Sequence, residues 1–476
     1  MINKSEDKRR TVQIVDLEGL VPQDHLLRKI DRAVYFTHIY DLVEDLYCHD
    51  NGRPAVDPVV LIKMVLIQHL YGIRSLRQTV KEIDMNIAYR WFLGYDFGTK
   101  IPHFATVSYN FLHRFNNNVF EEIFSWILET AFDMGYVKPE TVFIDSTHIK
   151  VNANKKKYHK TLARKAVRIY DKILHEEINS YRELNGKKSL KDNEAEPPPC
   201  QTIKSDVDPD CGLFHKGEHK VVMAYSAHTS CDKNNFILAV DITEGNINDS
   251  TAFDSIYAKT VERFPEVKAV TMDAGYKTPW ICKKVTDDGR IPSLPYKRPS
   301  GKKGFLRTYD YVYDEYYNCV ICPNDRVLPY ITTNKEGYRE FKSNPEDCRE
   351  CGYRYKCTQS REFQKTVHKH IWNDYIEMVE DIRHSPIGKE NYAKRSQTIE
   401  RVFADAKEKH GMRYTYYKGL EQATNWVRLK FACMNLKKLA LWKWKSCCKN
   451  FYITKYICLI RKPCCFIFIQ QGSLTV

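Results

Sequence analysis

The sequence has no uninterrupted apolar stretch of about 18 residues, the length that a membrane-spanning helix needs. Its most apolar long segment, 451–470, is interrupted by Lys455, Arg461, Lys462 and Pro463. The first ten residues, MINKSEDKRR, are polar and no apolar core follows them, so we expect no secretory signal. We also find no internal repeat. These absences argue against both a membrane protein and a secreted protein.

A disulfide framework is not expected either, although the chain contains 16 cysteines. Without an export signal, the chain is expected in the reducing cytoplasm, where cysteines remain thiols or bind metals.

The charge is unbalanced towards basic residues. Lys and Arg together number 74 against 60 Asp and Glu, a formal net charge of +14. Such an excess favours a polyanionic partner, first of all nucleic acid. Many basic proteins bind no nucleic acid, however, so charge alone leaves simple solubility as an equal alternative.

The chain is long enough for several domains, and residues 1–135 read as a helical one. A strongly apolar helix is predicted at 59–71, after the start signal of Asp57 and Pro58, and a helix pair at 75–93. Arg and Tyr recur between the apolar anchors, which suits a helix-turn-helix-like DNA reader. A bundle used only for packing or dimerisation is the alternative.

Residues 136–280 change to a pattern of strands interleaved with helices. Strands are predicted at 141–151, within 219–245 and at 267–276, and a helix at 249–264. This alternation favours an α/β sheet layer.

The rest of the chain divides by composition. Residues 152–212 form a basic, partly helical insert, and 281–385 an insertion rich in Tyr, Lys and Cys. Residues 386–441 carry a helix that begins at Ser396, and a second helix is expected at 420–441. The tail, 442–476, suggests no function.

Two acids follow apolar runs in the predicted strands, Asp145 after VFI and Asp273 after VTM. Ligands of open α/β sheets gather at strand ends, so neighbouring strands would bring the two carboxylates together. Clustered carboxylates hold the divalent cations that phosphodiester chemistry requires. The alternative is a pair of ordinary aspartates that cap the turns after their strands.

A third acid, Glu400, borders the apolar face of the helix from Ser396. That face has the i, i+3, i+4, i+7 spacing of a buried stripe, formed by Ile399, Val402, Phe403 and Ala406. Lys407 lies two turns after Glu400 on the same side. A surface glutamate beside an amphipathic stripe is the alternative.

The cysteines of the insertion have metal-ligand spacing. Cys319-x2-Cys322 precedes Cys348-x2-Cys351, and Cys357 follows. Four thiolates close a tetrahedral zinc site, and such a site would be structural because it leaves no open position. Five unligated thiols are the alternative.

In order and number, these segments resemble the DDE transposases of bacterial insertion sequences, more narrowly the branch with an InsH-type N-terminal domain. The resemblance covers about residues 10–440 and rests on GRPAVDPVVLIKMVLIQHLYGIRSLRQTVKEI, RWFLG, IDSTHIKVNANK, HTSCDKNNFILAVDITEGNINDS, VTMDAGY, IERVFADAKEKHGM, YYKGLEQA and NLKKLA.

The resemblance implies a ribonuclease H-like core, a mixed five-stranded sheet with flanking helices, preceded by the all-α N-terminal domain and interrupted by the cysteine-containing insertion. It implies that Asp145, Asp273 and Glu400 ligate Mg²⁺ or Mn²⁺. It further implies cleavage of the element's terminal repeats and transfer to target DNA by a homodimer associated with the nucleoid. A catalytically inactive DNA-binding derivative of a transposase and a nuclease that only cuts are the competing functions.

The sequence departs from the family pattern near the third acid. Related transposases place Tyr, Arg, Glu and Lys at fixed spacing; Glu400 and Lys407 fit, but Tyr392 and Arg395 lie one residue too far upstream. We expect Arg395 or Arg401, together with Lys407, near DNA phosphates. Further phosphate contacts are expected from the basic insert, with a solvated helix face as the alternative: Lys155, Lys156, Lys157, Arg164, Lys165 and Arg168.

Overall fold

The computed structural model describes residues 12, 14–48, 54–115, 117–154, 156–163, 170–191, 200–216, 220–298 and 302–460. The chain forms two compact units. One comprises residues 1–137, 409–411 and 428–476; the other comprises 138–408 and 412–427.

Every regular element that the structure describes in the first unit is helical. These elements are α1 (Leu17–Leu20), α2 (Leu26–Asp31), α3 (His38–Val43), η1 (Glu44–Leu46), α4 (Pro58–Leu70), α5 (Leu76–Met85), α6 (Ile87–Leu93), α7 (Phe104–Tyr109), η2 (Asn110–Arg114), α8 (Asn117–Asp133) and the later part of α17 (Leu420–Ile460).

Most residues of helix α4 are buried, which shows that this helix lies at the centre of the unit. Its start agrees with the sequence prediction: the Asp57 carboxylate accepts the Val59 N–H at 2.7 Å, and Pro58 occupies the first helical position. The helix expected at 420–441 continues to Ile460, and Arg428 in it pairs with Glu121 of α8 at 2.7 Å. No helix in the described part of the chain has both the length and the hydropathy needed to cross a membrane.

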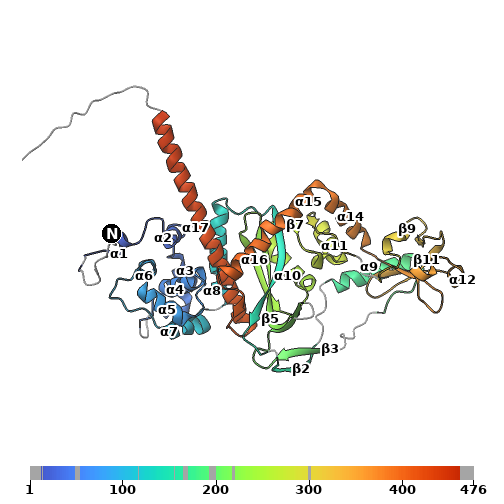
Figure 1. Cartoon of the computed structure of the whole chain (residues 1–476), viewed down its shortest axis with the longest axis horizontal. Helices are drawn as coiled ribbons and strands as arrows, with labels where there is room; N and C mark the ends of the chain where they lie inside the picture. Colours follow the sequence, from blue (N-terminus) through green and yellow to red (C-terminus); the bar gives the residue numbers. More distant parts are fainter. Residues whose placement is uncertain are drawn as a thin grey trace, which may run out of the picture. The chain divides into compact units, whose positions relative to one another are not determined.

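The second unit is built on a mixed sheet (Figure 1). Its strands are β1 (Thr141–Val151), β4 (Gly212–Lys216), β5 (Lys220–Asp232), β6 (Ile237–Glu244), β7 (Ala269–Thr271), β8 (Ile291–Ser293) and β14 (Tyr414–Thr415). The order is β4-β5-β1-β7-β8, with β6 also paired to β5 and β14 to β1. Strand β5 is antiparallel to β1, β4 and β6, whereas β7, β8 and β14 run parallel to their partners.

The centre of this sheet is covered on both faces, since Val142, Phe143 and Ile144 of β1 are all fully buried. Helix α10 (Asp249–Arg263) packs on β5 and β6, and α16 (Ile399–Glu408) packs on β1. At the other edge, α11 (Pro279–Asp287), α14 (Asn373–His384) and α15 (Pro386–Ala393) pack on β8.

Three predicted elements differ in extent. The strand expected at 267–276 is shorter, because β7 ends at Thr271 and the chain turns into η3 (Ala274–Tyr276). The helix expected from Ser396 begins at Ile399, after η5 (Lys394–Gln397). The basic insert contains α9 (Asp171–Leu184), but also an antiparallel strand pair of β2 (Tyr158–Ala163) with β3 (Cys200–Ser205).

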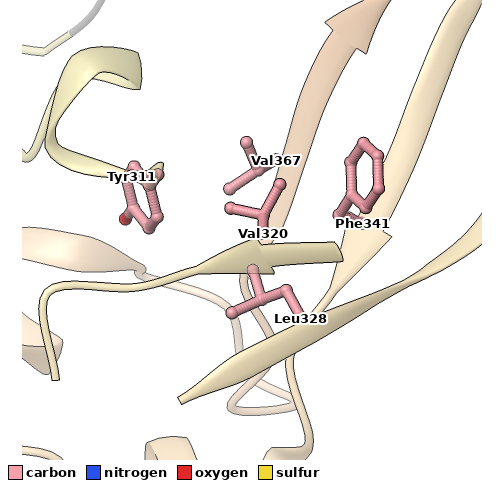
Figure 2. Packing of buried hydrophobic residues seen from close by; sticks show 5 residues of the cluster. All are labelled: Tyr311, Val320, Leu328, Phe341 and Val367. Atoms are coloured by element: carbon pink, nitrogen blue, oxygen red, sulfur yellow. The ribbon is translucent and has the colours of Figure 1, made fainter. Parts of the chain in front are cut away.

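The insertion contains a sheet of its own, in the order β13-β12-β11-β10-β9. It comprises β9 (Val312–Asp314), β10 (Cys319–Ile321), β11 (Val327–Thr333), β12 (Tyr338–Lys342) and β13 (Thr366–His370), with α12 (Pro345–Arg349) and α13 (Arg354–Cys357) beside it. Its core is small, consisting of Tyr311, Val320, Leu328, Phe341 and Val367 (Figure 2).

Because this core has so few members, truncating one of them should open the insertion locally. Phe341 is fully buried, and Phe341→Ala should cost about 3–5 kcal/mol. In hydrogen exchange read by mass spectrometry, β10–β13 should lose protection while β1 and β5 keep theirs. Tyr317→Ala is the control, because Tyr317 is 74% exposed. Equal loss of protection in both variants would contradict this account of the core.

Candidate active site

Asp145 and Asp273 are brought together by the pairing of β1 with β7. The two strands are parallel, and their last paired residues are Phe143 and Thr271. Asp145 and Asp273 each lie two residues beyond this pair, so their side chains leave the same face of the sheet. The sequence suggested that Asp145 lies near the end of its strand. It lies inside the strand instead, because β1 continues to Val151 and is paired there with β5.

Helix α16 supplies Glu400, one residue after its start. The predicted stripe of Ile399, Val402, Phe403 and Ala406 is buried, and the helix packs on β1. Glu400 lies at the border of this stripe, and its side chain is 53% exposed. The glutamate is therefore held close to the sheet while its carboxylate still meets solvent.

Arg395 links the acids. Its guanidinium donates to the Asp145 carboxylate and lies 3.5 Å from Oε1 of Glu400. The arginine is buried, and Asp145, Asp273 and Glu400 all raise its pKa against the opposing effect of burial. Thr398 separates η5 from α16 with φ −111° and ψ −100°. Arg395 thus reaches the acids despite its altered spacing in the sequence.

The electrostatics of this cluster centre on Asp145. Burial raises the pKa of its carboxyl to about 6, and the nearby Asp273 and Asp249 raise it as well. Arg395 and the backbone N–H of Ser146, which donates to Oδ1 at 2.8 Å, act in the opposite direction. Keeping this carboxylate ionised thus requires compensating positive charge.

Asp249 is a fourth acid of this cluster, and the sequence analysis missed it. It is the first residue of α10, and its carboxylate accepts the hydroxyl of Ser146, the neighbour of Asp145 in β1. In the sequence it belongs to the turn cluster 245–249 that follows a predicted strand. The rule that drew attention to Asp145 and Asp273, an acid shortly after a core strand, would also have selected it.

The expected phosphate-binding residues are only partly described. Lys156 and Lys157 are exposed ahead of β2, whereas Lys155, Arg164, Lys165 and Arg168 lie outside the described residues. Arg401 is exposed on α16 and lies 3.6 Å from Asp405, and Lys407 is half-buried on the same helix. Arg395 contacts carboxylates in this structure.

The cysteines of the insertion separate into two groups. Cys322, Cys348, Cys351 and Cys357 line one small pocket beside the core of the insertion. The described residues that line it do not include Cys319, which is buried in β10 between strands β9 and β11.

Neither cluster is a preformed metal site. Among the residues that the structure describes, no three His, Cys, Asp or Glu side chains are grouped so that they could hold a metal ion. In the acid cluster, the guanidinium of Arg395 supplies positive charge.

Two protein families match separate stretches of the chain. A family described as a transposase domain (DUF772) matches residues 15–113, which lie in the helical unit. A family described as a transposase DDE domain matches residues 321–440, which include Glu400 and the four cysteines Cys322, Cys348, Cys351 and Cys357. No curated protein matches the chain. Both matches confirm the resemblance to the DDE transposases of insertion sequences, and they do not specify the InsH-type branch.

Proposed function

We propose that the protein cleaves DNA at the ends of an insertion sequence and joins the freed ends to target DNA, using divalent cations held by Asp145, Asp273 and Glu400. The observation that carries this proposal is the cluster around Arg395. Its guanidinium contacts Asp145 and Glu400, and Asp273 raises its pKa. An acid of β1, an acid that follows β7 and an acid of a separate helix gather there, although they lie far apart in the sequence.

The donor set fits magnesium or manganese. Carboxylate oxygens are hard ligands of the kind that Mg²⁺ prefers. Asp145 is 15% exposed at its side chain and its pKa is raised by burial, so a cation would stabilise its ionised form. When bound, the cations lower the pKa of the attacking water or 3′-hydroxyl and stabilise the departing oxygen.

The residues of the chain have separate tasks in this proposal. Asp145 and Asp273 hold the cations from the sheet, and Glu400 does so from α16. Arg395 offsets the charge of the acids in the free protein. We propose that it turns towards a DNA phosphate once cations share the carboxylates, since its fork of donors suits either oxyanion.

The sheet supports the ribonuclease H-like architecture as part of this proposal. Five strands in the order β6-β5-β1-β7-β8 form a mixed sheet with helices packed on it. The acids converge on this sheet. This is the arrangement that the resemblance to DDE transposases implies.

DNA is the partner that the family and the basic charge both favour. We propose that Lys156, Lys157, Arg401 and Lys407 contact its phosphates, together with the basic residues outside the described parts. Binding would then weaken steeply with salt as counterions are released. A homodimer that pairs two element ends belongs to the same proposal.

The first test is cleavage of DNA that carries the flanking ends of the protein's own gene. With Mg²⁺, the wild type should cut at these ends and produce joined products. Asp273→Asn should bind the same DNA but cut at least about 100-fold more slowly, because even residues behind metal ligands contribute 10–100-fold. Rates are read from end-labelled DNA on denaturing gels.

Asp241→Asn is the matched control, because Asp241 lies on β6 of the same sheet and pairs with Lys259 at 2.8 Å. It should cut like the wild type. Binding without any cutting by the wild type in Mg²⁺ or Mn²⁺ would favour an inactive DNA-binding derivative. Cutting without joined products would favour a simple nuclease.

Cation binding should depend on pH in a direction set by Asp145. Its pKa is raised to about 6, so below that pH a cation must displace a proton from the folded protein. Mn²⁺ affinity, followed by electron paramagnetic resonance, should rise roughly tenfold per pH unit up to about pH 6 and then level off. An affinity that is constant between about pH 5 and 7 would refute this assignment.

We further propose a structural zinc ion in the insertion, bound by Cys322, Cys348, Cys351 and Cys357. The support is their shared pocket beside a core of only five buried side chains, since domains with so small a core commonly need a metal or disulfide staple. The thiols would have to move to close a tetrahedron, because they are not grouped as metal ligands in the described residues. Cys319 is left out of the set because it does not line the pocket.

Cysteine substitutions test this set. The wild type should contain about one zinc per chain by plasma mass spectrometry. Cys348→Ser or Cys351→Ser should lose most of it and lower the stability of the insertion. Cys319→Ser should retain the metal. If Cys319→Ser loses zinc as fully as Cys348→Ser does, the four-cysteine set is wrong.

A further inference from the structure

Asp249 occupies a defined position over the acid cluster. Asn248 caps α10, and the helix then runs along β5 and β6. Oδ1 of Asp249 lies 3.6 Å from Nδ1 of His228, and His228 is the partner of Ser146 in the β1–β5 register. Asp249 therefore faces the sheet one residue along β1 from Asp145.

The surroundings of Asp249 are not those of a surface acid. Its side chain is 27% exposed, and its pKa is raised chiefly by burial and also by Asp273. Ser146 donates a hydrogen bond to its carboxylate. In the described part of the chain, no Lys or Arg forms an ion pair with it.

His228 does not neutralise this carboxylate. Burial lowers the pKa of the fully buried imidazole to about 4, so the ring is uncharged at neutral pH. Its Nε2 is 2.9 Å from the Thr243 hydroxyl, which fixes the ring on the sheet. Its Nδ1 has no hydrogen-bond partner among the described residues and lies towards Asp249. The histidine thus faces the acid without cancelling its charge.

Tyr276 provides a second buried polar atom at the same place. It is fully buried, and its hydroxyl has no hydrogen-bond partner within the described residues. Burial raises the pKa of this hydroxyl, and Asp249, Asp145 and Asp273 raise it further. Buried polar atoms without partners are rare, and here two of them border the same acids. Both are explained if hydrated ions belong at this position.

We propose that Asp249 is a fourth acidic residue of the cation site, a positioning residue that holds water of a divalent cation whose direct ligands are Asp145 and Asp273. Ser146 orients its carboxylate, and Nδ1 of His228 and the Tyr276 hydroxyl, which lack hydrogen-bond partners in the described part of the chain, meet the same hydration shell. This proposal rests on the proposed function, since it assumes that the acid cluster binds cations. Residues in this outer position commonly change metal affinity or activity 10–100-fold.

The test is Mn²⁺ binding to the whole chain without DNA, measured by electron paramagnetic resonance. Asp249→Asn preserves shape but removes the charge, and it should weaken Mn²⁺ binding by about 10–100-fold. Asp254→Asn is the matched control, a partly buried acid of the same helix that accepts a hydrogen bond from Trp280 at 2.9 Å. It should bind Mn²⁺ like the wild type. Wild-type affinity in Asp249→Asn would overturn the proposal.

Asp273→Asn separates the two proposals. If Asp273→Asn loses Mn²⁺ binding while Asp249→Asn does not, the cation site stands and only the fourth acid fails. If neither changes binding, the proposed function fails as well. In cleavage assays, Asp249→Asn should need more Mn²⁺ for half its maximal rate yet approach the wild-type rate at saturation. An unchanged Mn²⁺ requirement would count against Asp249.

Ser146→Ala provides a second route if Asp249→Asn does not fold. It removes the hydroxyl that orients the carboxylate, so it should weaken Mn²⁺ binding in the same direction but less. Thermal unfolding without metal should show that this variant is folded. Normal Mn²⁺ affinity in folded Ser146→Ala would contradict the positioning role.

Discussion

The second unit depends on keeping several carboxylates ionised at the centre of a buried sheet. Asp145 follows three fully buried residues of β1, and Asp273 and Asp249 add negative charge nearby. Removing charged groups from water is costly unless opposite charge is supplied. In this structure Arg395 supplies the positive charge. Arg395 lies in η5, which packs on α16, and α16 in turn packs on β1. A protein that needs only stability would place apolar side chains there, and the charged arrangement supports the proposed cation site.

This constraint also explains the local irregularity before α16. The arginine and the glutamate must both reach the acids, although the sequence separates them by one residue more than the family pattern does. The end of the short η5 and the backbone of Thr398 lie between them, and Arg395 still contacts Asp145 and Glu400.

The insertion presents a different physical problem. It is a sheet with five core side chains, held within a unit whose other sheet is extensively buried. Four thiols gather where the short α12 and α13 meet this sheet. Loops and very short helices contribute little apolar burial, so a cross-link through a metal would compensate for the missing core.

Much of this was accessible from the sequence, because it depends on local patterns. Asp57 and Pro58 predict the start of α4, and the β-branched run predicts both ends of β1. The spacing of the apolar residues from Ile399 to Ala406 predicts the buried face of α16. The order of the motifs also indicated the transposase family, which the comparisons confirm.

Other features were decided only by tertiary structure, because they depend on register and on segments distant in sequence. The parallel pairing of β1 with β7 ends two residues before Asp145 and Asp273, and a slip of one residue in this register would shift the two acids relative to each other. The position of Asp249 beside Ser146 depends on how α10 crosses β5, and that of Arg395 on the backbone at Thr398. Likewise, spacing grouped Cys319 with the other four cysteines, whereas the pairing of β10 with its neighbours buries it away from their pocket. Local composition thus determined which residues are suited to the chemistry, and long-range pairing determined which of them meet.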